Sequence, residues 1–260
     1  MTTTEHSGSG DLSRSMALLW DINDRPSRGP RPALTLDRIV GAAIAVADAE
    51  GLEAVSMRRL AGDLGVGTMS LYRYVPGKGE LLDLMLDRVS AVDPERVGTL
   101  DDDWREALRQ LARGMWELYV GHPWLLHVDQ ARPVLGPNGL KGFEIALTGL
   151  DGTPLGGREK TNVVTIVEAL VSSIARTHVN AAQAEARTGI SDAEFWEAQM
   201  PALSKAMQSG AYPHIAALEP DAFSTPGDAV VAFAMERLID GFEVFFAGRD
   251  GPPPPGATCD

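Results

Sequence analysis

The sequence predicts an all-α protein, with a small three-helix domain towards the N-terminus and a larger helical domain after it. Every long segment repeats its apolar residues at helical spacing, and none alternates them as a half-buried strand does. Breaks containing Gly and Pro separate these segments. A chain of 260 residues is long enough to form two domains. We therefore divide it into a flexible arm (1–33), a small domain (34–80), a larger domain (81–248) and a disordered tail (249–260).

Two helices of the small domain have clear start and stop signals. The first is expected to begin after Thr35, a good N-cap residue, and to end at Gly51. Its apolar stripe consists of Leu36, Ile39, Val40, Ala43, Ile44 and Ala47. The second is expected to begin at Ser56 and to stop at Gly65, before a tight turn. Its inward residues are Met57, Leu60, Ala61 and Leu64.

The third helix of this domain is short and has an unusual outward face. Leu71 and Val75 are four residues apart and share the face that closes the core. The residues of the segment that are left for its surface are polar, aromatic, cationic or flexible: Thr68, Met69, Ser70, Tyr72, Arg73. Packing alone gives little reason for such a helix. In a helix-turn-helix, this face enters the major groove of double-stranded DNA.

The chemistry of the third helix fits contacts with bases and phosphates. Thr68 can hydrogen bond to a base edge, and Met69 can touch a thymine methyl group. Tyr72 and Tyr74 offer hydroxyl groups to phosphates, and Lys78 lies where the next helix begins, so that its ammonium and the backbone N–H groups can share a phosphate. Taken singly, each tyrosine is more often a half-buried core residue. Their combination in this order favours DNA binding.

The segment from Leu36 to Leu86 resembles the DNA-binding domain of tetracycline-repressor (TetR) family transcription regulators. The motifs that carry the resemblance are Ser56–Ala61, Leu64–Val66, Leu71–Val75 and Lys78–Leu82, and they span about a fifth of the chain. Val75 stands where many relatives have Phe, at a core position. The resemblance implies that the residues in contact with DNA are Arg58, Thr68, Met69, Ser70, Tyr72, Arg73, Tyr74 and Lys78.

The distribution of charge agrees with a DNA-reading domain on an acidic body. The whole chain has a formal net charge of −13. From Arg25 to Gly79, however, eight basic residues stand against five acidic ones, a net charge of +3, which leaves −16 for the remainder. Such an asymmetry keeps DNA on one part of the molecule and repels it elsewhere.

The two ends of the sequence are predicted to be disordered. Residues 1 to about 15 are rich in Thr, Ser and Gly, and the tail contains the sequence GPPPPG. Arg25, Arg28 and Arg31 follow on a proline-containing arm that can enter a minor groove; a plain solvated linker is an equally good interpretation. The single cysteine, Cys259, lies in the tail, so no intrachain disulfide is possible.

Six further helices are expected in the larger domain. They span 79–92, 104–120, 140–150, 158–187, 192–208 and 228–247. In the last of these the acidic residues form one stripe, and apolar side chains spread over most of the remaining circumference. Such a helix needs cover on more than one side. We therefore expect a homodimer through the helices 158–187 and 228–247, because helix-turn-helix proteins usually read two half-sites with a two-fold dimer.

The middle helices contain the residue types that commonly line a small-molecule pocket. Aromatic and soft side chains occur beside a few polar ones, as in apolar pockets with orienting hydrogen bonds. Candidate lining residues are Trp116, Tyr119, His122, Phe143, Arg176, His178 and Asn180. The resemblance implies an effector pocket whose occupancy alters the spacing of the two reading heads. For any single residue, ordinary core packing is the simpler interpretation.

Other functions find less support in the sequence. The histidines of HPWLLHVD have no established metal-ligand spacing, and no nucleophile motif or phosphate loop indicates an enzyme or a cofactor. Without a signal peptide or an apolar run that spans a bilayer, we expect a cytoplasmic protein and no membrane partner. The prediction is a repressor released from a palindromic operator by a small organic ligand. The alternative is a helix-turn-helix activator or protein-controlled regulator without such a ligand.

Overall fold

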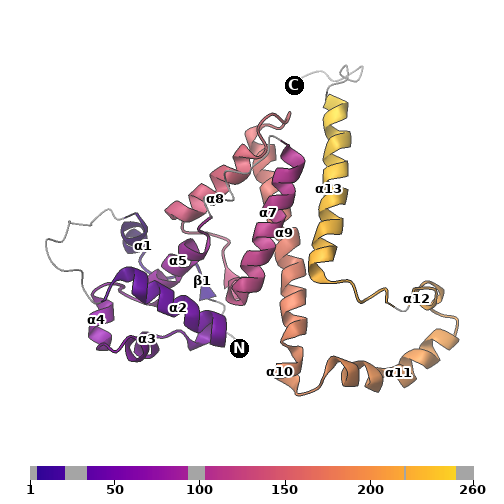
Figure 1. Ribbon diagram of the computed structural model, residues 1–260, viewed down its shortest axis with the longest axis horizontal. Coiled ribbons are helices and arrows are strands. Elements are labelled where there is room, and N and C mark those ends of the chain that lie inside the picture. The colour runs from indigo at the N-terminus through magenta and orange to yellow at the C-terminus, as the bar shows by residue number, and fades with distance from the viewer. Residues whose placement is uncertain (1–4, 21–33, 93–102, 220, 250–260) are drawn as a thin grey trace.

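The computed structural model describes residues 5–20, 34–92, 103–219 and 221–249, and the regular secondary structure within these ranges is helical except for two short strands (Figure 1). The predicted all-α class and its two-part architecture are confirmed. A small N-terminal helical unit lies on one side of the molecule, and long helices form a bundle on the other (Figure 1). The helix α5 joins the two parts, since it contacts α1 and α2 as well as α8.

The small domain has the three helices that the sequence predicted. Its elements are α2 (Leu36–Glu50), the 3-10 turn η1 (Leu52–Ala54), α3 (Met57–Asp63) and α4 (Thr68–Tyr72), followed by α5 (Lys78–Val89). The hydroxyl oxygens of Thr35 and Ser56 accept hydrogen bonds from backbone N–H groups at the starts of α2 and α3, as their N-cap roles require. The helix ends at Gly51 and near Gly65 are confirmed as well, and both glycines have positive φ.

The turn between α3 and α4 is a Schellman motif that orients the two helices. The N–H of Gly65 donates to the carbonyl of Gly62 at 3.1 Å, and the N–H of Val66 donates to that of Ala61 at 3.0 Å. Gly65 adopts φ +68°, a conformation that L side chains rarely adopt. Beneath the turn the core is closed by fully buried side chains, among them Ile39, Leu60, Leu71 and Val75.

The larger domain is built around one long helix. Its elements are α7 (Trp104–Gly121), η2 (Pro123–His127), β2 (Val128–Asp129), α8 (Pro137–Thr148), α9 (Gly157–Ala182), α10 (Ala184–Thr188), α11 (Asp192–Gln208), α12 (Pro213–Ala216) and α13 (Gly227–Arg249). The helix α9 packs against α7, α8 and α13 and buries a row of small apolar residues. Of the predicted helix 158–187, the last residues form the separate helix α10.

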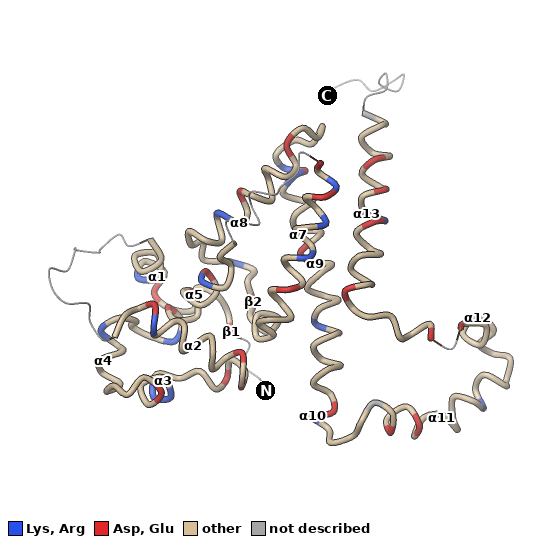
Figure 2. Tube along the Cα trace, viewed as in Figure 1, with Lys and Arg blue, Asp and Glu red and all other residues tan. Residues whose placement is uncertain are grey.

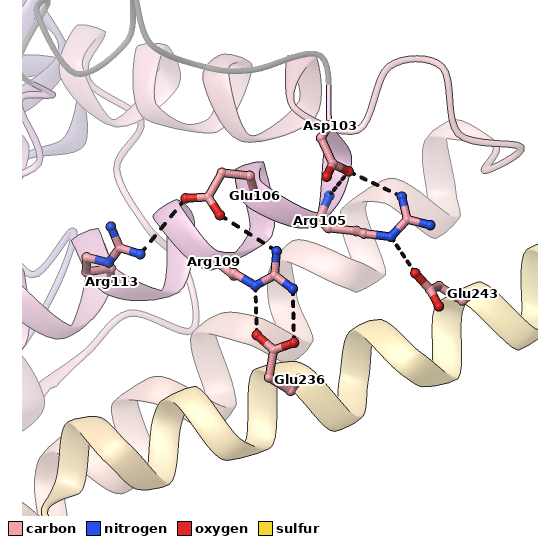
Figure 3. A network of polar contacts seen from close by, with 7 residues as sticks. All are labelled: Asp103, Arg105, Glu106, Arg109, Arg113, Glu236 and Glu243. Atoms are coloured by element: carbon pink, nitrogen blue, oxygen red, sulfur yellow. Dashed lines mark hydrogen bonds and ion pairs between the residues drawn. The ribbon is translucent and has the colours of Figure 1, made fainter.

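Two of the three acidic residues of the stripe on α13, Glu236 and Glu243, face α7 and form ion pairs there (Figure 3), while Asp240 pairs with Arg237 of the same helix. The guanidinium of Arg109 donates two hydrogen bonds to Glu236, at 2.7 and 2.9 Å, and Arg105 pairs with Glu243. Beside this stripe, Val231, Met235 and other apolar residues of α13 are buried against the bundle. The carboxylates therefore fix the rotation of α13 and leave its second apolar face outward.

The helices α11 and α12 extend away from the bundle (Figure 1). None of the described side chains from residue 193 to residue 218 is buried. Several of them are large and apolar: Phe195, Trp196, Met200, Leu203, Tyr212, Ile215 and Leu218. An arm of this composition is typical of a surface that another chain covers.

The predicted disorder of residues 1 to about 15 is wrong for residues 5–15, which include β1 (Glu5–His6) and the first half of α1 (Leu12–Leu19). The strand β1 pairs in parallel with β2, and α1 packs on α5. The physical reason is that Ser, Asp and Gly residues of this segment donate hydrogen bonds to carboxylates of α5 that are buried and need such partners. Composition alone gives no sign of these long-range hydrogen bonds.

Candidate DNA interface and effector cavity

The helix α4 presents the outward face that the sequence predicted. The side chain of Met69 is 77% exposed and that of Tyr72 is 43% exposed. Thr68 and Ser70 are partly buried at the start of the helix, while Leu71 between them and Tyr72 is completely buried. A helix of five residues is thus held by its inner side chains and projects a mixed apolar and polar surface, as direct contacts with base edges require.

The cations around α4 differ in their freedom to meet DNA. Arg58 and Arg73 are exposed, and within the described ranges neither lies within ion-pair distance of a carboxylate. Arg59 is tied down, because it donates two hydrogen bonds to Glu50, at 2.9 and 2.7 Å, and one to Asp63 at 2.8 Å. These bonds raise the pKa of Arg59 further and lower that of Glu50. Figure 2 shows basic residues on α3 and beside α4, and acidic residues spread over most of the molecule.

Two of the candidate phosphate contacts, Tyr74 and Lys78, are only partly exposed. Tyr74 packs against the core of the small domain. The ammonium of Lys78 lies 2.8 Å from a carboxylate oxygen of Glu5 and 3.4 Å from the carbonyl oxygen of Leu52. In this structure Lys78 is therefore engaged within the protein. The predicted arm residues Arg25, Arg28 and Arg31 lie outside the described residues.

A cavity of about 220 Å³ lies between α7, α9 and the segment η2–β2. Its lining residues are Tyr119, Leu125, Leu126, Val128, Gln130, Glu168, Ser172 and Arg176. Leucine and valine side chains from η2 and β2 supply an apolar wall, and the exposed side chains of Glu168 and Arg176 supply opposite charges. The arrangement can hold a ligand that combines an apolar body with hydrogen-bonding groups.

Tyr119 is the buried polar group of this cavity. Burial raises its pKa to about 12, and the nearby carboxylate of Glu168 contributes in the same direction. The phenol is protonated at neutral pH, as an ordinary tyrosine is, and can donate a hydrogen bond.

Of the seven predicted pocket residues, the structure places two, Tyr119 and Arg176, in the cavity. The rings of Trp116 and His178 contact each other, with centroids 5.1 Å apart, beside the start of α13. Phe143 is exposed on α8, and Asn180 accepts a hydrogen bond from a residue of α10.

His122, another of the seven, faces the small domain. Its Nδ1 lies 2.8 Å from a carboxylate oxygen of Asp48 on α2, and the indole N–H of Trp124 donates to the same oxygen at 2.8 Å. Within the described residues, no group of three or more His, Cys, Asp or Glu side chains is placed to hold a metal ion. None of the helices in the described ranges combines the length and apolarity that crossing a bilayer requires.

Gln130, Glu168 and Ser172 were missed because no sequence motif contains them. Glu168, Ser172 and Arg176 follow one another at intervals of four, so that they share one face of α9. This polar stripe is the one feature of the sequence that could have indicated Glu168 and Ser172 as pocket residues. Its direction becomes clear only once α7 and η2 cover the adjacent, valine-rich face of α9.

A projecting helix on a three-helix head, joined to a helical bundle with a cavity, defines a helix-turn-helix transcription regulator. Residues 98–246 match the family model of the tetracyclin repressor-like C-terminal domain, and residues 39–85 match that of bacterial regulatory proteins of the tetR family. The chain belongs to the tetR family of bacterial regulatory proteins.

Individual relatives cover most of the chain. The HTH-type transcriptional repressor DrrR1 of Streptomyces coeruleorubidus is 51% identical over 249 residues, which are 96% of this chain and 92% of that protein. An HTH-type transcriptional regulator of Saccharopolyspora erythraea is 30% identical over 190 residues, which are 72% and 80% of the two chains. The crystal structure of the Streptomyces coelicolor TetR family protein ActR in complex with actinorhodin matches with a TM-score of 0.62 and 28% identity, and covers 84% of this chain and 99% of ActR.

Proposed function

We propose that the protein is a dimeric repressor that binds a palindromic operator and is released from it by a small organic ligand. The observation that carries the DNA-binding part is the outward face of α4, where Met69 and Tyr72 are exposed, together with the exposed cations Arg58 on α3 and Arg73 at the end of α4. The name of DrrR1, a transcriptional repressor that is half identical in sequence, supports repression over activation.

The proposed dimer pairs α9 and α13 with the same helices of a second copy. The outward face of α13 contains Phe233, 65% exposed, and Val244, 75% exposed, and α9 adds Ile166, 46% exposed. A four-helix bundle formed across a two-fold axis buries these side chains and places two copies of α4 on one side of the molecule. The apolar arm α11–α12 starts from the end of α9 and α10, so that a second copy packed on α9 and α13 offers it a surface to cover.

The proposed effector site is the cavity lined by Tyr119, Glu168 and Arg176. The actinorhodin complex of ActR supports a small organic ligand for a chain with this fold. At about 220 Å³ the cavity is smaller than the roughly 300–1,000 Å³ of ordinary ligand sites. We therefore expect it to enlarge when the ligand enters, which is a route by which occupancy changes the structure around η2.

Two measurements test the proposed function. Duplex fragments of genomic DNA that the protein retains should share an inverted repeat, and the isolated repeat should bind more tightly than its scrambled sequence. With actinorhodin as the probe, the melting temperature of the free protein should rise and its affinity for the operator should fall. The two effects should occur together, because a ligand that binds the DNA-free state more tightly lowers the affinity for DNA by the same factor by which DNA lowers the affinity for the ligand. Stabilisation without loss of DNA affinity would favour the regulator without a small-molecule effector. Failure to bind duplex DNA at low ionic strength would reject both.

A further inference from the structure

We propose that the N-terminal strap, which we define as residues Glu5 to Leu19, couples the effector cavity to the DNA-binding head by holding Lys78 away from DNA. Glu5 is the positioning residue of this device. The inference rests on the proposed function and adds to it a path of regulation through a segment outside the family's matched domains, which begin at residue 39.

The strap is firmly attached to α5 by buried polar contacts. Asp83 is only 1% exposed and accepts hydrogen bonds from the hydroxyl groups of Ser7 and Ser15, at 3.1 and 2.6 Å, and from the N–H of Gly8 at 2.9 Å. Glu80 is also buried and accepts from a backbone N–H of the strap at 2.7 Å. Because buried carboxylates without partners are costly, the docked strap is the stable state of the free protein.

Two glycines allow the strap to lie directly on the first turn of α5. A Cβ atom on Gly79 would lie 2.5 Å from the backbone nitrogen of Gly10 and 2.8 Å from its Cα atom. The backbones therefore meet without side chains between them, one residue beyond Lys78. This contact covers part of the helix start that was predicted to be free for a phosphate.

Glu5 and a DNA phosphate are competitors for the same ammonium group. The Nζ of Lys78 lies 2.8 Å from Glu5 Oε1, and both side chains are about one-third exposed. A phosphate that approaches Lys78 brings negative charge beside this carboxylate, so that DNA binding and the ion pair oppose each other. Release of Glu5 therefore raises DNA affinity.

The same residue is paired with the wall of the cavity. Glu5 lies opposite Val128 in the parallel β1–β2 pair, and Val128 lines the cavity. The N–H of Ser7 donates to the carbonyl of Asp129 at 3.0 Å and extends the pairing. A ligand that packs on Val128 and orders β2 stabilises the docked strap, which keeps Lys78 engaged. By linkage, DNA must loosen the strap to the same degree.

The test is a double-mutant cycle on binding to a duplex of arbitrary sequence at low ionic strength, with the full chain. Because Lys78 is assigned to a phosphate, no operator is needed. Glu5→Gln should tighten binding about two- to fivefold, the range expected for an exposed ion pair. In the background of Lys78→Met the same substitution should have no effect. Glu53→Gln is the matched control, since Glu53 is an exposed acid that follows Leu52, the carbonyl partner of Lys78.

Each outcome of the cycle supports or overturns the inference. Tightening by Glu5→Gln that exceeds that of Glu53→Gln and disappears with Lys78→Met supports it. If Glu5→Gln and Glu53→Gln have equal effects, or if the effect of Glu5→Gln persists in the Lys78→Met background, then Glu5 acts only through its negative charge and the inference is overturned. If the parent ignores the duplex, the proposed function fails first; if the parent binds and Glu5→Gln does not tighten, only the role of the strap fails.

Hydrogen exchange tests independently whether the strap responds to DNA. On addition of the same duplex, backbone amides of residues 5–8 should exchange faster, because DNA disfavours the docked strap. Amides in the buried part of α9, from Val163 to Val171, serve as the internal control and should not change. Unchanged or slower exchange in residues 5–8 with DNA bound would show that the strap does not respond to DNA, and would overturn the coupling.

Discussion

We expect the side chains of the DNA-binding head to fall into two groups, those that determine base preference and those that bind phosphates of the DNA backbone. Arg58→Ala or Thr68→Ala should cost about 1–3 kcal/mol of operator binding and relax base preference, because each removes a hydrogen-bond donor that we assign to a base edge. Lys78→Met should weaken binding to all sequences alike and reduce the slope of log affinity against log salt by about 0.9, the share of one neutralised phosphate. Fluorescence anisotropy on operator and scrambled duplexes measures both effects.

Arg59 provides the control for this division. Its guanidinium is already bonded to Glu50 and Asp63, so that Arg59→Ala should change the operator-to-scrambled ratio less than Arg58→Ala does. An unchanged ratio in Arg58→Ala, or a larger change in Arg59→Ala, would contradict the assignment of Arg58 to bases.

Tyr119 should make the stability of the fold depend on pH in the alkaline range. Its folded-state pKa of about 12 lies above the ordinary value of 10.0, so the neutral phenol stabilises the fold below about pH 10 and this contribution is lost as the pH rises towards 12. The denaturation midpoint of the parent should therefore fall more steeply between pH 9 and 11 than that of Tyr119→Phe. The exposed Tyr212 is the control, and Tyr212→Phe should follow the parent. If both variants do, the cavity tyrosine is not protected as described.

At the scale of elements, the turn of the helix-turn-helix depends on backbone conformation rather than on space. Nothing lies within 4 Å of a Cβ atom built on Gly65 or on Gly62. Gly65 has φ +68°, whereas Gly62 lies inside α3. Gly65→Ala should destabilise the fold by about 1–2 kcal/mol, and Gly62→Ala should stabilise it by about 0.5–1 kcal/mol. Chemical denaturation of both variants measures the difference, and equal free energies of unfolding would remove the argument from φ.

The elements that the sequence predicted well are those with local signals. Thr35, Ser56 and Gly51 mark helix ends through hydrogen bonds and φ values that depend on neighbouring residues only, and each was found in its expected place. The period of apolar residues likewise predicted the helices of the larger domain. The unpredicted break between α9 and α10 falls at Gln183, where the composition gives no Gly or Pro signal.

The elements that escaped prediction depend on contacts between distant parts of the chain. The strap is polar and rich in small residues, and its order comes from Asp83, which lies 68 residues or more away from its serine partners. The cavity depends on the way α7 covers α9, so that Tyr119 and Arg176 could be chosen by composition, while Glu168 could not. His122 was misplaced for the same reason, because its partner Asp48 belongs to the other domain.

At the scale of the whole molecule, several polar links connect the DNA-binding head with the helical bundle, in addition to the apolar core that the two parts share. Asp87 of α5 accepts hydrogen bonds from the backbone N–H groups of Asn138 and Gly139, at 3.0 Å each, at the start of α8. Asp48 links α2 to η2, and the strap links α5 to β2. Since η2 and β2 also line the cavity, a change in the cavity wall reaches the head by two separate connections. Polar links of this kind have discrete geometries, which suits a two-state switch.

A palindromic operator is read by two DNA-binding heads, so the proposed function requires a dimer. Phe233→Glu places a charge on the outward face of α13, and Leu140→Glu places the same charge on α8, where Leu140 is 39% exposed. Burying an unpaired carboxylate in a dimer interface is costly, so Phe233→Glu should convert the dimer to a monomer at micromolar concentration in sedimentation, while Leu140→Glu should remain dimeric. The monomer should keep the circular dichroism of a helical protein and its weak affinity for one half-site. It should lose the tighter binding to the full inverted repeat. In a dimer, binding of one head raises the effective concentration of the second head at the other half-site, and a monomer has no second head. A parent that sediments as a monomer, or a Phe233→Glu variant that still binds the full repeat like the parent, would show that the second apolar face of α13 serves some purpose other than pairing two heads on DNA.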